Sequence, residues 1–577
     1  MKFESMKSLS EQIFFKLIFR LFVLILLICP QTGCWLWEGK RSESAKTLST
    51  VESVNFLQSG GDFWAQIKIN DIPVGYQQTV ITILADGKTL ADNEALADDE
   101  ADGEATDGKS PESPESQEKQ QPTRYRIEQN IHVKIERNGT PVLMRWAIQS
   151  VEQADGTFIS AVKEETLSDK SSTTVYLLEG DTMIRTTKST DGSAYQTEVP
   201  VEPNGLGPNA VLFSFLNKPM RIGESRSIKF YDLMIENYAS VELTAAKVES
   251  FEVFGSPANL LRIDGKIRFS DGTTIPSTYW TDAGGHIIRN EIDQPGNKWV
   301  ITMVGPSEAK ASLEQPQKFD PGKFSFIPVR GTLESPYQTG LVKYRVQLKK
   351  TPTESGMNLE KLLPVSPGQA VEFVNPQTAE VTVKAFQTDI VAAPETIASE
   401  TYSPDDLAAN PWIQSDNPYI VKMAEQAVPG EQLPLALADG LQRFVAQNMN
   451  RSEIRGVVSS AAEAAQSLSG DGMESAFLLA ALARARGIPA RVVVGMIYSQ
   501  AASGEPVMVF HLWNELYIGG HWRPYDATLE SGADDAARIR LGASNLTSES
   551  LETFLRPVVF AANNLQVEIL EVAPPGE

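Results

Sequence analysis

Apolar and polar residues alternate along much of the first half of the chain. Two clear runs are FWAQIKI at 63–69 and YRIEQNIHVKI at 125–135. A period of two is typical of β-strands that bury one face. Turn pairs of the type Asn-Gly or Asp-Gly recur between such runs at 138–139, 155–156, 191–192 and 271–272. The pattern predicts an antiparallel all-β domain, a meander or half-barrel, over residues 50–310.

The second half of the chain changes to a mixed pattern. Short apolar runs punctuated by proline continue over 318–395 and predict a small β domain. Apolar residues then recur at helical spacing in 420–427, 435–448 and 459–468. We therefore predict a multi-domain protein in which an α+β domain occupies residues 405–577.

Composition and charge support several domains and exclude one class of partner. A chain of 577 residues with 42% apolar composition exceeds the size of a single hydrophobic core, which stops growing at roughly 250 to 300 residues. The formal charge of −23, without any cluster of Lys or Arg, provides no basic field for a phosphate backbone. We expect no nucleic-acid partner. Residues 91–122 are acidic with almost no bulky apolar side chains, which predicts a disordered insert.

The N-terminus has the pattern of an export signal. Four basic residues accompany the apolar run 21–29, which is too short to span a bilayer by itself but is typical of a signal-peptide core. The run leads to Gly33-Cys34, which resembles a bacterial lipoprotein cleavage box, so we predict a signal peptide at 1–33 and lipidation of Cys34. Ordinary cleavage nearby and an uncleaved anchor over 13–29 are the alternatives. All three predict an exported protein on the periplasmic side of the cell envelope, and two anchor it to the membrane.

Cysteine and histidine are scarce, which limits the available chemistry. Cys29 and Cys34 are the only cysteines, and both lie in the targeting region. The exported part of the chain therefore has no disulfide, thiolate metal site or thiol nucleophile. The sequence contains only four histidines and spells out no His-rich metal cluster. We expect neither a metal nor another cofactor.

One segment near the C-terminus brings two candidate catalytic side chains together. The sequence predicts a helix over 470–486, a strand over 492–495 and a hairpin whose turn is Gly519-Gly520. In that register, His511 and Asp526 are diagonal neighbours on one face, about 7 to 8 Å apart by backbone. This spacing suits a carboxylate hydrogen-bonded to an imidazole. Without the upstream helix, such a pair is a weak signal.

Four sequence blocks around this hairpin carry a specific resemblance. They are GDGMESA at 470–476, GIPAR at 487–491, HLWNE at 511–515 and WRPYD at 522–526. In this order they resemble the transglutaminase-like (papain-type) superfamily, whose bacterial members read Gly-Asp-Cys-x-Glu-x-Ala in the first block. The resemblance implies a papain-type α+β fold and thiol-dependent acyl transfer, as in cysteine proteases and transglutaminases.

The resemblance assigns a role to each matching position. His511 takes the position of the general base, and Asp526 takes that of the residue that orients it. The nucleophile position holds Gly472 instead of cysteine. Ser475, one helical turn further on, has a hydroxyl displaced by about 5 Å from that position at 1.5 Å rise per residue. The expected protein is therefore a pseudoenzyme that retains two of three triad positions.

Three functions remain compatible with this pattern. The first is binding of a peptide or an envelope protein in a groove lined by Trp513, Tyr517 and Trp522. The second is residual hydrolysis through Ser475 or through water activated by the general base. The third is a structural envelope lipoprotein whose groove is empty.

Overall fold

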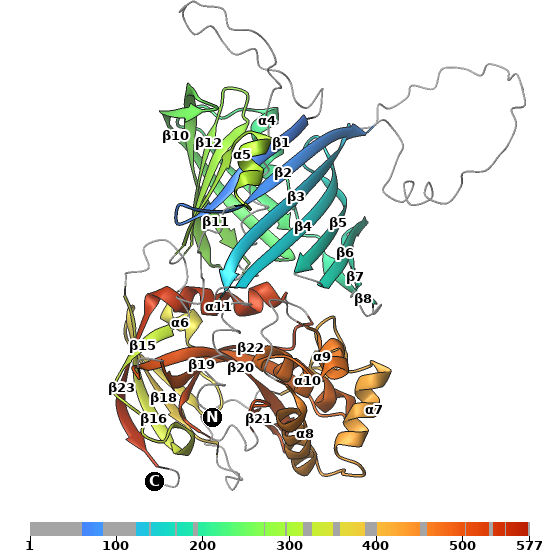
Figure 1. The fold of residues 1–577 in the computed structure, drawn as a ribbon, viewed down its shortest axis with the longest axis vertical. Coiled ribbons are helices and arrows are strands. Elements are labelled where there is room, and N and C mark those ends of the chain that lie inside the picture. The colour runs from blue at the N-terminus through green and yellow to red at the C-terminus, as the bar shows by residue number, and fades with distance from the viewer. Residues whose placement is uncertain are drawn as a thin grey trace, which may run out of the picture.

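The computed structural model describes residues 61–84, 123–314 and 326–574. Shorter gaps within these ranges fall at 138–139, 168–169, 189–193, 271, 295–296, 350–357, 387–400, 451–458, 502–503, 530–534 and 548–549. The predicted signal peptide with Cys34 and the predicted acidic insert 91–122 lie outside the described residues. The described chain forms two parts, a large antiparallel sheet and a mixed α+β part (Figure 1).

The first part is one antiparallel sheet. Within the described residues its fourteen strands follow the order β8-β7-β6-β5-β4-β3-β2-β1-β14-β13-β12-β11-β10-β9. The strands are β1 (Gly61–Ile69), β2 (Ile72–Leu84), β3 (Arg124–Arg137), β4 (Thr140–Gln153), β5 (Phe158–Leu167), β6 (Lys170–Glu179), β7 (Thr182–Lys188), β8 (Ala194–Pro200), β9 (Ser225–Asp232), β10 (Asn237–Val253), β11 (Ser256–Phe269), β12 (Thr274–Thr281), β13 (Ile287–Gln294) and β14 (Asn297–Met303).

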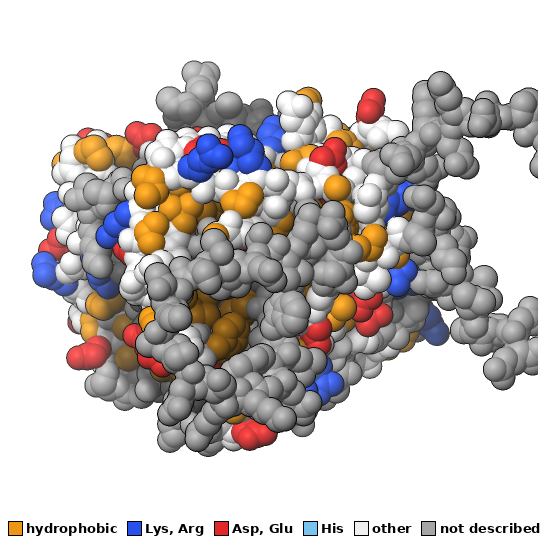
Figure 2. Space-filling view, turned by 90° about the horizontal axis from the view of Figure 1, so that it is seen from above, with side chains coloured by type: hydrophobic (Ala, Val, Ile, Leu, Met, Phe, Trp, Pro, Cys, Tyr) orange, Lys and Arg blue, Asp and Glu red, His pale blue; other side chains and the backbone are white. Residues whose placement is uncertain are grey.

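The order shows two meanders joined where β1 pairs with β14, which leaves β8 and β9 as the edges. Helix α4 (Ala210–Asn217) lies in the connection between these edges, and α5 (Pro306–Ala311) follows β14. Figure 1 shows the strands curving around a common interior. Seen from above, hydrophobic side chains are visible within a hollow in the molecule (Figure 2).

A buried ionic cluster connects the two meanders across the interior. The Glu236 carboxylate, in the turn between β9 and β10, accepts hydrogen bonds from Lys163 Nζ (2.8 Å), Tyr176 Oη (3.0 Å) and Arg185 Nη1 (2.8 Å). The three donors come from β5, β6 and β7. Burial by itself would raise the pKa of Glu236, but the two cations lower it to about 2. Glu236 has a φ of 53°, so the cluster holds a backbone conformation that few non-glycine residues adopt.

Glu152, at the end of β4, is a second fully buried carboxyl group. Its oxygens accept hydrogen bonds from Ser150 Oγ (2.8 Å) and from the side chain (2.6 Å) and backbone (3.2 Å) nitrogens of Asn209. Burial raises the pKa of Glu152 to about 7, and the hydrogen bonds limit the rise. Because Asn209 directly precedes α4, this carboxyl fixes the start of the helix between the two sheet edges.

The second part is built on another sheet. Among the described residues it has nine strands, in the order β17-β18-β16-β23-β15-β20-β19-β22 with β21 paired to β20. They are β15 (Phe326–Arg330), β16 (Leu341–Leu348), β17 (Gln369–Asn375), β18 (Thr378–Lys384), β19 (Ala490–Gln500), β20 (Pro506–Ile518), β21 (His521–Tyr525), β22 (Arg538–Ser544) and β23 (Leu565–Ala573). The strands β15 to β18, which the sequence assigned to a small domain of their own, share this sheet with the C-terminal strands.

Six α-helices belong to this part in the described chain. They are α6 (Leu359–Leu362), α7 (Pro418–Ala427), α8 (Pro434–Asn448), α9 (Ala461–Ser467), α10 (Gly472–Ala485) and α11 (Leu551–Asn564). Helix α11 lies between the two parts of the molecule (Figure 1), where the Arg556 guanidinium stacks over the Phe269 ring at 4.4 Å. The predicted fold class, an antiparallel all-β region followed by an α+β domain, is confirmed. No helix of the described residues is long and apolar enough to cross a membrane.

Replacing Glu152 by Gln should change how stability depends on pH. The folded-state pKa of about 7 exceeds the unfolded value of 4.5, so between these pH values the folded chain keeps a proton that the unfolded chain has released. The free energy of unfolding should therefore fall as pH rises through this window, and less steeply in the variant. Urea unfolding at several pH values measures the slopes, with Glu198→Gln on the exposed surface of β8 as the matched control. Equal slopes in wild type and Glu152→Gln would contradict this account.

Candidate functional site

Helix α10 is the core element on which the candidate site is built. Its residues 472–484 are all buried, as expected for a helix that is largely apolar on every face. Asp471 caps its N-terminus by accepting a hydrogen bond from Met473 N at 2.8 Å. Glu474 completes a capping box through Asp471 N (2.9 Å) and also accepts from Ser459 N (2.9 Å). The acidic residues of the first turn therefore cap the helix and complement its dipole.

Polar contacts fix the body and the C-terminal end of α10. The side chain of Asn514 on β20 donates to Ala476 O at 2.9 Å and joins the helix to the sheet. At the other end, the Arg484 guanidinium donates to the carbonyl oxygens of Ala490 and Ala408 at 2.6 to 3.1 Å. Gly487 follows the helix with a φ of 77°, the left-handed conformation that usually ends helices in glycine. The helix is thus held at a fixed position against β20.

The hairpin of β20 and β21 has the register that the sequence predicts. Ile518 pairs with His521, and both Gly519 (φ 64°) and Gly520 (φ 87°) adopt the positive φ of a two-residue turn. This register brings His511 and Asp526 together. The imidazole Nε2 lies 2.8 Å from Asp526 Oδ2, and both side chains are almost fully buried, 1% and 2% exposed.

The Asp526 carboxylate is surrounded by further donors. Oδ1 accepts hydrogen bonds from the backbone N (2.9 Å) and Oγ1 (2.6 Å) of Thr528, and Oδ2 also lies 3.6 Å from Arg538 Nη1. Burial alone would raise the pKa of Asp526, but His511, Arg538 and Thr528 outweigh it and hold the pKa well below its usual range. The carboxylate therefore stays ionised and fixes the imidazole through Nε2. Among the described residues, His511 Nδ1 has no hydrogen-bond partner.

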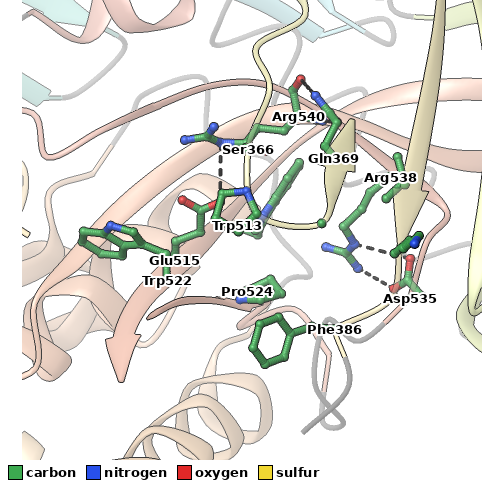
Figure 3. Close-up of a pocket in the computed structure, with 14 residues that line it drawn as sticks. Ser366, Gln369, Phe386, Trp513, Glu515, Trp522, Pro524, Asp535, Arg538 and Arg540 are labelled. Carbon is green, nitrogen blue, oxygen red and sulfur yellow. Dashed lines mark hydrogen bonds and ion pairs between the residues drawn. The ribbon is translucent and has the colours of Figure 1, made fainter. Parts of the chain in front are cut away.

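Three aromatic residues that the sequence proposed as a groove lining lie on the same hairpin. The Trp513 ring lies 6.4 Å from the His511 ring, with the two planes at 23°. Trp513 and Trp522 line a pocket of about 500 Å³, counting its open mouth (Figure 3). Tyr517 does not line this pocket, but it packs edge to face against Trp522 with ring centroids 5.3 Å apart. All three rings therefore lie on this hairpin, and Trp513 and Trp522 line the pocket.

The two helix residues weighed as nucleophile positions are both buried. Gly472 is the first residue of α10, next to the capping Asp471. Ser475 is 0% exposed, and its hydroxyl donates to Asp471 O at 2.7 Å. This hydrogen bond within the first helical turn engages the only proton of the Ser475 hydroxyl.

Sequence reasoning missed the charged groups behind Asp526. Arg538 on β22 donates to Asp535 Oδ2 at 2.6 Å and stacks over the Trp513 ring at 5.3 Å. Tyr337 is an uncharged neighbour of these groups, from the connection between β15 and β16, and is 44% exposed. Its partial burial, together with Asp535 and Asp526, raises its pKa to about 12. The sequence signal available was Arg538-Ile539-Arg540, two arginines on one strand face in an acidic chain. Neither Arg538 nor Arg540 belongs to the four sequence blocks.

A core helix packed on an antiparallel sheet that carries a buried imidazole–carboxylate pair is the arrangement of a papain-type α+β domain. The comparison with protein families agrees with this class. Residues 421–527 match the model of the transglutaminase-like superfamily. The chain therefore contains a transglutaminase-like domain, and the matched region includes α10, His511 and Asp526.

Comparison with solved structures gives weaker likenesses. A putative cysteine protease from Cytophaga hutchinsonii is 18% identical, with 43% of this chain and 90% of that chain covered and a TM-score of 0.24. A putative protease from Parabacteroides distasonis is 11% identical, covering 65% and 68%, with a TM-score of 0.17. A β-barrel-like protein from Brucella abortus is 9% identical, covering 42% and 95%, with a TM-score of 0.29. These scores are too low to establish a shared fold. No curated protein matches the sequence significantly.

Replacing Asp526 by Asn should strongly destabilise the C-terminal part. The variant removes the charge that holds the buried His511 ring and lies 3.6 Å from Arg538, which keeps Asp535 as its second partner. Breaking a buried charge pair costs about 3 to 5 kcal/mol. The urea midpoint of the corresponding unfolding transition measures the loss. Asp264→Asn removes an exposed carboxylate paired with Arg262 and should shift stability by less than about 1 kcal/mol. Similar shifts in the two variants would contradict a central role for Asp526.

Proposed function

We propose that this chain is a catalytically inactive transglutaminase-like protein that binds a peptide or an envelope protein in the groove beside His511 and Asp526. The observation that carries the proposal is Gly472 at the first residue of α10, where the family resemblance places the nucleophilic cysteine. The general-base and orienting positions are retained and hydrogen-bonded to each other. The site therefore keeps the apparatus that activates a thiol and lacks the thiol.

Covalent acyl transfer needs a side chain that attacks the acyl carbon. Glycine has none, and the chain contains no cysteine after Cys34. Ser475 is an unsuitable replacement because its hydroxyl is fully buried and bonded to Asp471 O. Loss of one triad member leaves only the rate supplied by binding and oxyanion stabilisation, on the order of 10³ to 10⁴ over water. This argues against the residual hydrolase as the function of the site.

The features that remain suit binding. The carboxylate holds His511 through Nε2, so the ring presents its other nitrogen in a fixed orientation. The adjacent pocket offers the flat rings of Trp513 and Trp522, together with charged groups. Aromatic and arginine side chains of this kind are the residues that most often anchor a bound peptide or protein.

We also propose that the protein is exported and held at the membrane through its N-terminus. The support is the sequence of the first 34 residues, in which basic residues accompany an apolar run that leads to Gly33-Cys34. Membrane attachment on the periplasmic side would keep the binding domain at the cell envelope, where peptide and protein partners are available.

Introducing the missing thiol tests the proposed site. If the groove keeps the family arrangement, Gly472→Cys places a sulfur at the N-terminus of α10 and beside His511, and both favour the thiolate. In a Cys34→Ser background, the ultraviolet absorbance of the thiolate should develop at a lower pH for this cysteine than for the exposed control Ser256→Cys, and this readout needs no reagent to reach the buried position. His511→Ala should remove the difference. Equal midpoints with and without the imidazole would show that His511 does not interact with a side chain at position 472.

Replacing Cys34 by Ser tests membrane attachment. The hydroxyl cannot take the place of the thiol that receives the lipid, so the variant should appear in the soluble exported fraction or accumulate unprocessed. Fractionation of cells with detection of the full chain measures this. A variant that stays membrane-bound and is processed like wild type would rule out lipid attachment at this residue.

A further inference from the structure

The pocket beside the imidazole–carboxylate pair has a definite chemical character. Trp513, whose ring lies 6.4 Å from the His511 ring, is one of its lining residues. Its walls come from β20, β21, β22 and the segments around β17 and β18 (Figure 3). One wall is fixed by Gln369, whose side chain accepts from Arg540 N (2.8 Å) and donates to Arg540 O (3.0 Å). The pocket is therefore preformed by contacts between segments far apart in the sequence.

Two of the groups that line this pocket carry hydrogen atoms that no described acceptor receives. They are the indole Nε1 of Trp522 and the hydroxyl of Ser366. The side chains are only 2% and 3% exposed. A buried donor without a partner lowers stability. Two such donors at one pocket point to a ligand that supplies acceptors.

The charges around the pocket indicate the sign of that ligand. Its acidic groups are already paired, because Glu515 Oε2 receives Arg491 Nε at 2.6 Å and Asp535 holds Arg538. The lining contains three basic side chains, Lys384, Arg538 and Arg540, against two acidic ones. Arg538 pairs with Asp535 and Arg540 with Glu515, so the exposed Lys384 is the surplus charge of the lining. In a chain of formal charge −23, this is a locally cationic pocket.

We propose that this pocket binds a peptide through a carboxylate group. The inference rests on the proposed function and names the chemistry that the groove recognises. A carboxylate brings acceptors without donors, which matches an indole N–H and a hydroxyl in a pocket that is also lined by basic side chains. A carboxamide would direct its own NH₂ group at these donors. The rings of Trp522 and Phe386 bound the pocket and provide apolar contact for the adjoining part of the peptide.

The carboxylate has two sources in a peptide, an acidic side chain and the chain terminus. Two matched pairs of N-acetylated alanine pentapeptides distinguish them. The first pair has an amidated C-terminus and either Glu or Gln at the central position. The second pair is all alanine, with either a free or an amidated C-terminus. Titration calorimetry with the full chain measures each Kd. The Glu peptide or the free-terminus peptide should bind at least tenfold more tightly than its neutral counterpart, and the tighter of the two identifies the source.

Two mild substitutions connect this preference to the pocket. Trp522→Phe keeps an aromatic ring and removes the N–H, and Ser366→Ala removes only the hydroxyl. Each should weaken the preferred carboxylate peptide about tenfold, since a lost hydrogen bond to a charged acceptor is worth roughly that factor. Each should leave the neutral peptide unchanged. Ser499→Ala, in a separate pocket near Tyr337, is the matched control and should bind like wild type.

The outcomes separate this inference from the proposed function. Equal binding of charged and neutral peptides would overturn carboxylate recognition if Trp522→Phe and Ser366→Ala also bind like wild type. Peptide binding by an inactive site would still stand in that case. A preference for carboxylate that survives both substitutions would locate recognition outside this pocket and also overturn the inference. If none of the four peptides binds, carboxylate recognition is wrong, while the Gly472→Cys experiment still tests the inactive site independently.

Discussion

The buried Asp526 carboxylate is the constraint on which the candidate site depends. An ionised carboxyl at 2% exposure requires strong partners, and the chain provides them from three directions. His511 comes from β20, Thr528 follows β21, and Arg538 comes from β22. The Gln442 side chain on α8 donates to the backbone oxygen of Asp526 at 3.1 Å and ties the same turn to a helix. Asp526 thus connects three strands through its carboxylate and a helix through its backbone oxygen.

This dependence explains why the pair can persist without a nucleophile. Removing His511 or Asp526 alone would leave its partner buried and unsatisfied, so structure alone favours keeping both. Retention of the pair is therefore weak evidence for catalysis. The unsatisfied donors around the neighbouring pocket differ in this respect, because they lower stability and have no structural reason in the described chain. These donors are therefore stronger evidence for ligand binding than the retained His511–Asp526 pair.

The parts of the site that depend on turns, strand alternation and helix ends could be predicted from the sequence. Gly519-Gly520 set the turn, the turn set the register, and the register brought His511 to Asp526. The core helix followed from its cap and its terminal glycine. Arg538 and Ser366 could not be found in this way, because neither lies on the hairpin. Arg538 is placed by the pairing of β22 with β19, about 40 residues away, and Ser366 lies next to a segment that bonds to Arg540 across 171 residues. The sequence also did not predict that β15 to β18 share one sheet with the C-terminal strands, because that sheet depends on long-range pairing. It rests on pairings such as Val346 with Val567, which alternation within one strand does not specify.

We propose that the transglutaminase-like site binds a peptide without catalysing a reaction. The most direct test is to follow binding and bond cleavage together, by incubating the wild-type chain with a peptide that it binds and analysing protein and peptide by intact mass spectrometry. We expect a complex in which the peptide stays intact and the protein acquires no acyl adduct. Peptide cleavage or transfer by wild type that disappears in His511→Ala would contradict it.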